Sequence, residues 1–183
     1  MSAPIPPFPK GSFTRTKQIP NTTTTYLLTD DPSLIDFPAL SAAFTSPLVW
    51  WATTPSTPSQ LQALVQNSYS FGLYHITDNS TAKTMVGFAR LITDYVTFAY
   101  LTDVYVLKEH QGLGLGNFMM EGVKDACAGW PDFRRGLLIT NGGSGAEKVY
   151  RRVFGAIDIR ERPRVDGEGE LIAMEWKNKK AEV

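Results

Sequence analysis

The sequence contains one cysteine, Cys127, among its 183 residues. A single cysteine cannot form an intrachain disulfide, so the chain is not a disulfide-stapled scaffold, and this cysteine usage suits a reducing compartment. No apolar run approaches the roughly 20 residues that a membrane-spanning helix needs. The N-terminus "MSAPIPPFPKGSF" is rich in proline and lacks the charged and apolar regions of a secretion signal. We therefore expect a cytoplasmic protein without a membrane partner.

Net charge is also absent, because 18 basic residues balance 18 acidic ones and the pI is near 6.7. Proteins that bind nucleic acid usually carry a basic surface that neutralises phosphates. We therefore expect no nucleic-acid partner.

The length and a hydrophobic content of 43% are sufficient for one buried core. No internal repeat or long linker divides the chain. We expect a flexible, proline-rich tail at residues 1–20, followed by a single domain at residues 21–183.

Strand and helix signals alternate along this domain. Asp31 and Pro32 have the N-cap and N1 residue types that open a helix, and a second helix is expected to begin near Ser59. Further helices are expected from the glycines after residue 111 to about Ala128 and over residues 145–154. Strands are expected at residues 22–30, 68–77, 84–93, 97–107, 136–140 and 170–177. The order predicts an α/β or α+β fold, with a mixed sheet covered by helices and an antiparallel meander within it.

A glycine-rich loop lies between an expected strand and an expected helix, in the sequence "QGLGLG" from Gln111 to Gly116. Glycines allow a ligand to approach the backbone, and the free N–H groups of a first helical turn favour an anion. A phosphate or pyrophosphate is therefore the expected occupant.

Three phosphate loops and a turn without a ligand are the alternatives. A dinucleotide loop, G-x-G-x-x-G, needs a glycine where Asn117 stands, and a P-loop needs a lysine after its glycines. Neither pattern fits these residues. A coenzyme A pyrophosphate loop remains, because turn chemistry alone explains one or two glycines better than three at alternate positions.

Two segments resemble the GNAT superfamily of acetyl-CoA-dependent N-acetyltransferases, in particular its small bacterial and fungal members. Gln111-x-x-Gly114-x-Gly116 resembles the R/Q-x-x-G-x-G/A signature, and residues 87–116 resemble the two strands and loop that contain it. The segment "LLITNGGSGAEKVYRRVFGA", residues 137–156, resembles the family's A-x-x-x-Y segment, with Ala146 and Tyr150 in register. The resemblance covers about half the chain.

This resemblance implies a mixed, mostly antiparallel sheet of about six or seven strands flanked by about four helices, with acetyl-CoA as co-substrate and no metal. In such proteins the pantetheine arm pairs with a strand edge, and the pyrophosphate lies on the glycine loop. The implied cofactor-binding residues are Val104, Tyr105, Val106, Gln111, Gly112, Leu113, Gly114, Leu115, Gly116, Asn117, Asn141 and Ala146.

The resemblance also implies a catalytic set. The backbone N–H of Val104 would stabilise the oxyanion, and Tyr150 would protonate the leaving thiolate. By strand alternation we expect Tyr100, Thr102 and Val104 to share one face. Tyr100 and Thr102 hold the family's base positions but are neither carboxylates nor histidines. The base therefore stays open, with Asp103, Asp94 and His75 as further candidates nearby in sequence or on adjoining strands.

Trp50, Trp51 and His75 are the candidate substrate residues, with the tryptophans between the two early helices. The expected acceptor is a primary amine of a small molecule or peptide, acetylated by direct transfer in a ternary complex, and the protein is expected to be a monomer or homodimer. The alternatives are another acyl-CoA donor or a non-catalytic acyl-CoA-binding sensor. Tyr150 and the two tryptophans could also be core residues.

Overall fold

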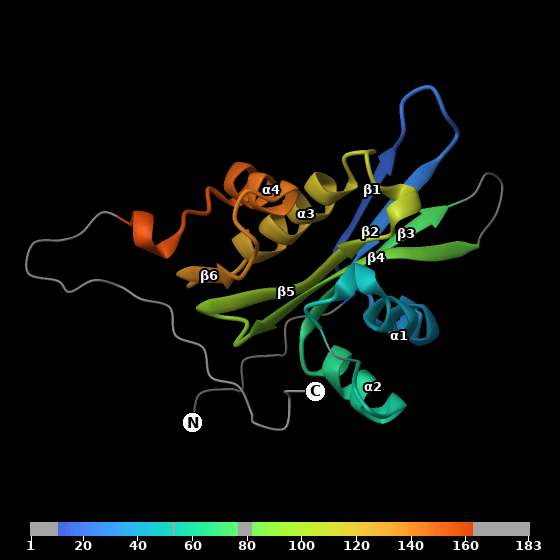
Figure 1. Ribbon diagram of the computed structural model, residues 1–183, viewed down its shortest axis with the longest axis horizontal. Helices are drawn as coiled ribbons and strands as arrows, with labels where there is room; N and C mark the ends of the chain where they lie inside the picture. Colours follow the sequence, from blue (N-terminus) through green and yellow to red (C-terminus); the bar gives the residue numbers. More distant parts are fainter. Residues whose placement is uncertain (1–10, 53, 77–81, 163–183) are drawn as a thin grey trace, which may run out of the picture.

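The computed structural model describes residues 11–52, 54–76 and 82–162. Within these residues one six-stranded sheet has its strands in chain order (Figure 1). Neighbouring strands are antiparallel except β5 and β6, which are parallel. The strands are β1 (Thr14–Gln18), β2 (Thr25–Thr29), β3 (Tyr69–Ile76), β4 (Lys83–Thr93), β5 (Phe98–Val106) and β6 (Arg135–Leu138). The predicted mixed, mostly antiparallel sheet is confirmed.

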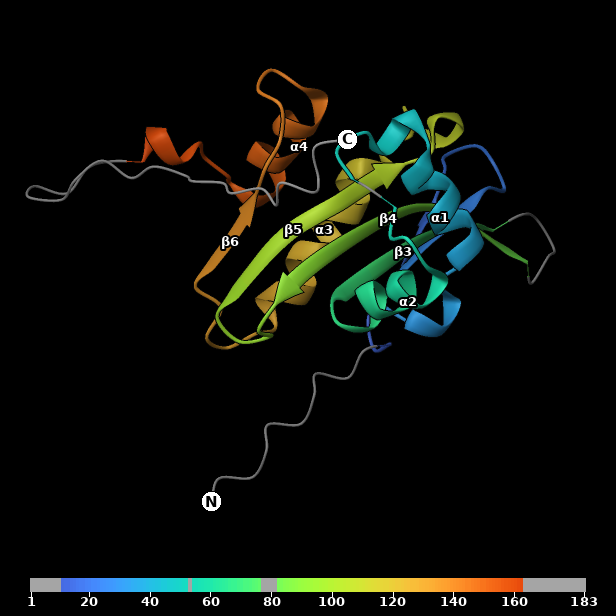
Figure 2. The same cartoon turned by 60° about the horizontal axis from the view of Figure 1, so that its bottom comes forward.

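Helices cover both faces of the sheet, with α3 and α4 on one face and α1 and α2 on the other (Figures 1 and 2). The α-helices are α1 (Phe37–Thr45), α2 (Pro58–Gln66), α3 (Leu115–Ala128) and α4 (Gly145–Phe154). Short 3-10 helices are η1 (Pro32–Leu34), η2 (Pro47–Val49), η3 (Lys108–His110) and η4 (Ile159–Glu161). This three-layer arrangement leaves each face of the sheet with its own core.

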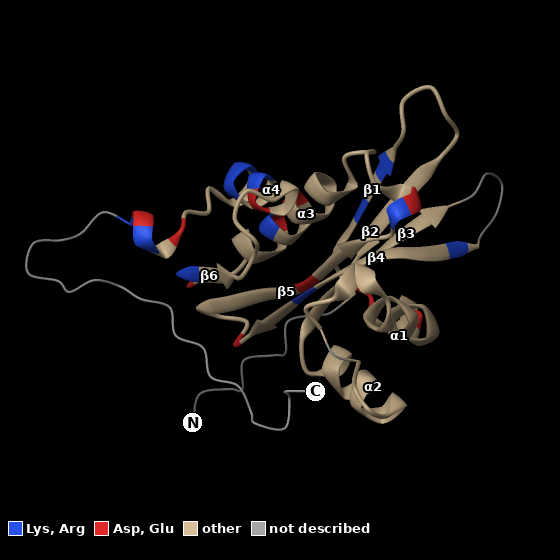
Figure 3. Cartoon of the chain, in the orientation of Figure 1, with Lys and Arg blue, Asp and Glu red and all other residues tan. Residues whose placement is uncertain are grey.

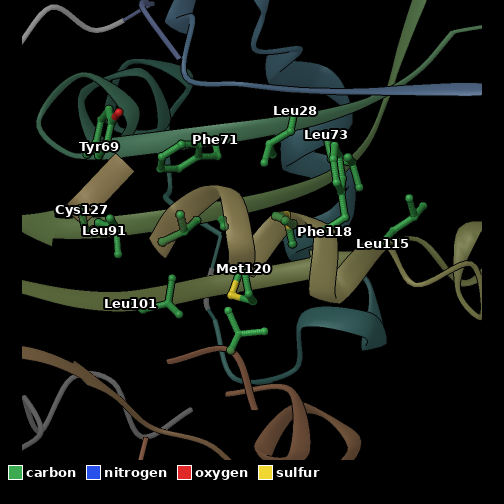
Figure 4. Close-up of a cluster of buried hydrophobic side chains, with 14 of the residues drawn as sticks. Leu28, Tyr69, Phe71, Leu73, Leu91, Leu101, Leu115, Phe118, Met120 and Cys127 are labelled. Atoms are coloured by element: carbon green, nitrogen blue, oxygen red, sulfur yellow. The ribbon is translucent and has the colours of Figure 1, made fainter. Parts of the chain in front are cut away.

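Helix α3 supplies the larger core with a stripe of buried residues that lies across β2 to β5 (Figure 4). The helix comes very close to the sheet at Gly122, where an added Cβ would lie 2.3 Å from Leu28 Cδ2. A larger residue here would force the buried Leu28 side chain to move. Cys127 is buried in the same core, and burial raises the pKa of its thiol to about 12, so the thiol stays protonated near neutral pH.

The second core lies between the sheet and helices α1 and α2, where Leu40, Phe44 and Leu61 pack against Phe88 and Tyr105. Helix α2 begins with a capping box. The Thr57 hydroxyl accepts from the Gln60 N–H, and the Gln60 side chain accepts from the Thr57 N–H. The second early helix therefore begins where the sequence predicted it, within one residue.

Two sequence predictions need correction. Asp31 and Pro32 open only the 3-10 turn η1, while Asp36 caps the first α-helix, because its side chain accepts from Ala39 N–H at 3.0 Å. The tail predicted at residues 1–20 contains strand β1, so the folded domain begins earlier than residue 21. The strand predicted at residues 170–177 lies outside the described residues.

Candidate active site

Strands β5 and β6, the last two strands of the described sheet, pair over only part of the length of β5. Their parallel pairing runs only from Phe98 with Arg135 to Leu101 with Leu138, and β5 then continues to Val106. The β5 edge from Thr102 to Val106 therefore has no strand partner on the β6 side among the described residues. An unpaired strand edge offers N–H and C=O groups to an extended ligand.

The backbone groups of Val104 and Val106 point to this open edge. Leu107 N–H donates to Val86 O on β4 at 2.8 Å, so by alternation the groups of the residue before it point away from β4. Val106 O accepts from the Gln111 side-chain Nε2 at 2.8 Å instead of from a strand. Gln111 thereby ties the glycine loop to the open edge.

A β-bulge interrupts β5 at the point where the edge opens. Asp103 and Val104 together lie opposite one β4 residue, Ala89. Asp103 has a φ of 53°, a left-handed conformation that aspartate tolerates better than most residues. The bulge turns the backbone at Val104. Before the bulge the odd-numbered residues of β5 face the α3 core, and after it the even-numbered residues do.

This reversal makes one prediction wrong. Leu101 and Val104 both pack in the core beneath α3, whereas Tyr105 belongs to the core beneath α1. Tyr100 and Thr102 alternate with Leu101 and therefore lie on the α1 and α2 face. The three residues Tyr100, Thr102 and Val104 do not share a face, because the extra residue of the bulge shifts the alternation by one.

A buried ion pair holds the bulge. Arg90 Nη2 and Nε lie 2.6 and 2.7 Å from Asp103 Oδ2, and the Thr102 hydroxyl donates to Asp103 Oδ1 at 3.2 Å. The exposed fractions of the Arg90 and Asp103 side chains are only 13% and 7%. Both oxygens of Asp103 thus already accept hydrogen bonds, which argues against this carboxylate as the base.

The glycine loop leads directly into α3. Gly112 and Gly114 have φ values of 81° and 71°, and Gly114 is the N-cap of α3 without a side-chain hydrogen bond to the helix. A Cβ added at Gly112 or Gly116 would meet no atom within 4 Å. The loop surface is therefore open, and the first N–H groups of α3 are available to an anion. In the same loop the Leu113 side chain is exposed, whereas the Leu115 side chain is buried.

Helix α4 is held against α3 by two polar contacts, one at the beginning of α3 and one in its second half. The Arg152 guanidinium donates to the Asn117 side chain in the first turn of α3, and Lys124 Nζ donates to Val153 O at 2.9 Å. At the other end of α4, Ala146 is exposed, as is Asn141 in the preceding loop. Neither has a side-chain contact that assigns it a role.

Tyr150 lies on the inner face of α4. It is buried with the α3 core and stacks on Phe154, with ring centroids 6.4 Å apart. No described residue forms a hydrogen bond with its hydroxyl. Burial raises its pKa above the ordinary value, so the phenol is neutral and can donate a proton over the whole physiological range.

The opposite face of the sheet carries two aromatic side chains just after η2. Trp50 and Trp51 follow η2, which contacts β5, and their side chains are 68% and 47% exposed. Their rings form an edge-to-face pair with centroids 5.9 Å apart. These exposures make them surface residues, not core residues.

This side of the molecule is also almost without charge. Residues 37–77 contain no Lys, Arg, Asp or Glu. Figure 3 shows α2 free of charged residues, whereas α3 and α4 carry both signs. The Arg90–Asp103 pair is neutral overall, and besides burial the nearby Asp36 carboxylate raises the pKa values of Tyr74 and Tyr105 in this core. The α1 and α2 face therefore carries a small negative charge and no unpaired cation from residues 37–76.

His75 lies away from this face. Its ring packs against Tyr26 and His110, with centroids 5.3 Å from each. The Tyr26 hydroxyl lies 2.8 Å from His110 Nδ1, and Tyr26 belongs to the α3 core. The sheet therefore separates His75 from Trp50 and Trp51, and the structure does not bring the three predicted substrate residues together. Alternation along β3 is the physical reason, because His75 follows the α3-facing residues Phe71 and Leu73.

Over the described residues, no helix is both long and apolar enough to cross a membrane. The same residues contain no group of three His, Cys, Asp or Glu side chains positioned to hold a metal ion.

The open strand edge beside the glycine loop, with a buried tyrosine on a neighbouring helix, agrees with the arrangement that the resemblance to acetyltransferases predicted. The family model described as the acetyltransferase (GNAT) family matches residues 38–156. The chain therefore belongs to the GNAT acetyltransferase family and is an acyltransferase, as the glycine signature and the A-x-x-x-Y segment predicted.

Individual relatives agree with this assignment. A Gibberella zeae protein, FG08082, whose name describes it provisionally as an acetyltransferase, is 39% identical over 148 residues, covering 74% of this chain and 81% of that protein. A GNAT-family crystal structure from Xanthomonas campestris has a TM-score of 0.55 at 32% identity and covers 73% of this chain and 84% of that one. A Clostridium acetobutylicum structure described with acetyl-CoA has a TM-score of 0.50 at 16% identity, covers 79% and 96% of the two chains, and shows the shared fold.

Sequence reasoning missed two features of the site. The Arg90–Asp103 pair joins residues on two strands, and an aspartate within a strand-like run was its only signal, since aspartate is rare in strands. Lys17 was missed because it lies in the segment predicted as a tail. In the structure its Nζ lies near Gly114.

Proposed function

We propose that this protein transfers an acetyl group from acetyl-CoA to the primary amine of a small molecule, directly and within one ternary complex. The observation that carries the proposal is the open edge of β5, which continues through Gln111 into the glycine loop. A chain of unpaired backbone groups followed by a helix N-terminus suits an extended arm that ends in a pyrophosphate. Acetyl-CoA supplies an acyl thioester when bound.

The residues of this chain then have separate tasks. Val104 N–H, turned to the open edge by the bulge, stabilises negative charge on the thioester oxygen as the amine nitrogen attacks the carbonyl carbon. The carbon–sulfur bond breaks, and Tyr150 gives its proton to the departing sulfur. The amine must also lose a proton. Because Asp103 is engaged by Arg90 and Thr102, this proton leaves through water beside Tyr100 and Thr102.

The charge distribution supports a particular class of acceptor. Polyamines, aminoglycosides and lysine-rich peptides carry several positive charges and need several carboxylates for binding. The face beneath Trp50 and Trp51 offers aromatic surface and only a small negative charge. We therefore propose an acceptor with one amine and an apolar or aromatic body. Cytoplasmic location and a monomeric or homodimeric state remain predictions.

An acceptor panel tests this function. With acetyl-CoA present, we expect release of free thiol with aromatic or alkyl monoamines and much slower release with spermine or a lysine-rich peptide. A thiol reagent reports coenzyme A selectively, because the protein's own Cys127 is buried. Faster turnover of the polycations would contradict the proposed acceptor class.

The engagement of Asp103 favours one second candidate, a coenzyme A-binding module without catalysis. Such a protein would bind coenzyme A in titration calorimetry but release no thiol with any amine. Thiol release with propionyl-CoA in preference to acetyl-CoA would instead identify a different acyl donor.

Replacing Trp50 or Trp51 by alanine tests the acceptor side. We expect KM for the amine to rise about tenfold and KM for acetyl-CoA to change less, since an aromatic contact of about 1 kcal/mol or more is lost only on that side. Because both side chains are largely exposed, the melting temperature should stay nearly constant. If the melting temperature and both KM values moved together, the tryptophans would be structural.

A further inference from the structure

Strand β1 places two basic side chains side by side against α3. Arg15 and Lys17 alternate along the strand and so share a face. The guanidinium carbon of Arg15 lies 5.4 Å from the centre of the Phe118 ring, and Lys17 Nζ lies 5.9 Å from it. Phe118 belongs to the first turns of α3, so both cations lie near the beginning of that helix.

The two cations differ in their partners. Arg15 forms ion pairs with Glu121 and Asp125 of α3, at 3.3 and 3.1 Å. Lys17 forms no ion pair within the described part of the chain. The α3 carboxylates therefore account for the position of Arg15 but not for that of Lys17.

Lys17 has one attractive contact, with the Phe118 ring, but its ammonium also lies close to the N-terminus of α3. Its Nζ lies 3.7 Å from the position that a Cβ on Gly114 would occupy, and Gly114 is the N-cap of α3. A helix N-terminus carries partial positive charge and repels an ammonium group. An anion between the Lys17 ammonium and the first N–H groups of α3 would remove this repulsion, because it would accept hydrogen bonds from both.

We propose that Lys17 binds the pyrophosphate of coenzyme A from β1, at the glycine loop. This inference rests on the proposed function, because it takes the loop as the pyrophosphate site. Lys17 would add a charged donor to the backbone N–H donors of Gly112 to Asn117. The edge strand β1 thereby becomes part of the cofactor site.

Titration calorimetry with Lys17→Met tests the proposal, because methionine keeps much of the lysine stem but removes the charge. We expect the Kd for coenzyme A to rise about tenfold, and Lys17→Arg to retain most of the affinity. Dephospho-coenzyme A lacks the 3′-phosphate but keeps the pyrophosphate, so it should show the same loss. Pantetheine, which lacks all phosphates, should bind the wild type and the variant equally.

Arg15→Met is the matched control on the same strand and face. Because Arg15 already has two carboxylate partners, its removal should leave coenzyme A affinity unchanged while lowering the melting temperature slightly. Lys17→Met should change the melting temperature of the free protein little, since Lys17 forms no ion pair within the described part of the chain and methionine can keep a contact with the Phe118 ring. A merely structural lysine would show the opposite pattern.

Three other calorimetric results would each contradict the proposed role of Lys17. Unchanged coenzyme A affinity in Lys17→Met would overturn the proposal while leaving the proposed function intact. A loss that disappears with dephospho-coenzyme A would place Lys17 at the 3′-phosphate and overturn the pyrophosphate assignment. A wild-type protein that binds no coenzyme A would overturn both the inference and the proposed function.

Discussion

Replacing Tyr150 by phenylalanine is expected to lower kcat by about 10²-fold to 10⁴-fold, with the affinity for acetyl-CoA nearly unchanged. The change removes one oxygen and keeps the ring stacked on Phe154. No described residue forms a hydrogen bond with this hydroxyl, so its removal breaks no visible structural contact. Any large loss of rate would therefore report proton donation to the leaving sulfur.

Two pKa values determine how large the loss of kcat should be and how the wild-type kcat should depend on pH. The thiol of coenzyme A has a pKa near that of free cysteine, about 8.5, so its thiolate leaves moderately well and the loss should lie toward the smaller value. Burial raises the pKa of Tyr150, so the phenol keeps its proton as pH rises through the neutral range. We expect no decrease in wild-type kcat from this group below a pH of about 10.

Tyr74→Phe provides the matched control. Tyr74 is also a buried tyrosine, it lies in the α1 and α2 core, and its hydroxyl has no hydrogen-bond partner among the described residues. Its replacement should leave kcat unchanged. Steady-state rates and calorimetric affinities would be measured on the same preparations, and full kcat in Tyr150→Phe would remove this residue from the mechanism.

The elements of the fold could be predicted because local signals determine them. The meander of β3, β4 and β5 follows from β-forming runs with short connections, and α3 follows from apolar residues at helical spacing after the glycines. The first helix was placed too early because Asp31-Pro32 and Asp36 both have capping chemistry, and tertiary packing decides between them. Strand β1 was hidden by the proline-rich segment before it.

The site was less predictable where it depends on contacts between strands. Alternation assigns faces correctly only when no residue is inserted, and a bulge at Asp103 has no reliable local signature. A non-glycine residue at positive φ follows from its environment, here the hydrogen bonds from Arg90 and Thr102. For the same reason sequence alone kept Asp103 among the candidate bases, whereas the structure assigns its oxygens to other partners.

The second large effect is a loss of stability when the Arg90–Asp103 ion pair is broken. Arg90→Leu should lower the free energy of unfolding by about 3 kcal/mol or more, because it leaves the Asp103 carboxylate buried without its guanidinium partner. Thr102 alone would still donate to that carboxylate. The bulge should also loosen, so Val104 N–H would be less well oriented and kcat should decrease in the folded fraction.

A double-mutant cycle separates the pair from its two members. Asp103→Asn is the suitable partner change, since asparagine tolerates a φ of 53° and keeps the side-chain shape. Because Arg90→Leu with Asp103→Asn buries no unpaired charge, the double variant should be more stable than Arg90→Leu alone, with a coupling of about 1–3 kcal/mol in urea unfolding. If the stability losses of the two single variants simply added in the double variant, water would screen the Arg90–Asp103 interaction and the pair would contribute little. If Asp103→Asn abolished kcat at unchanged stability, Asp103 would be the base after all, and proton removal through water beside Tyr100 and Thr102 would be wrong.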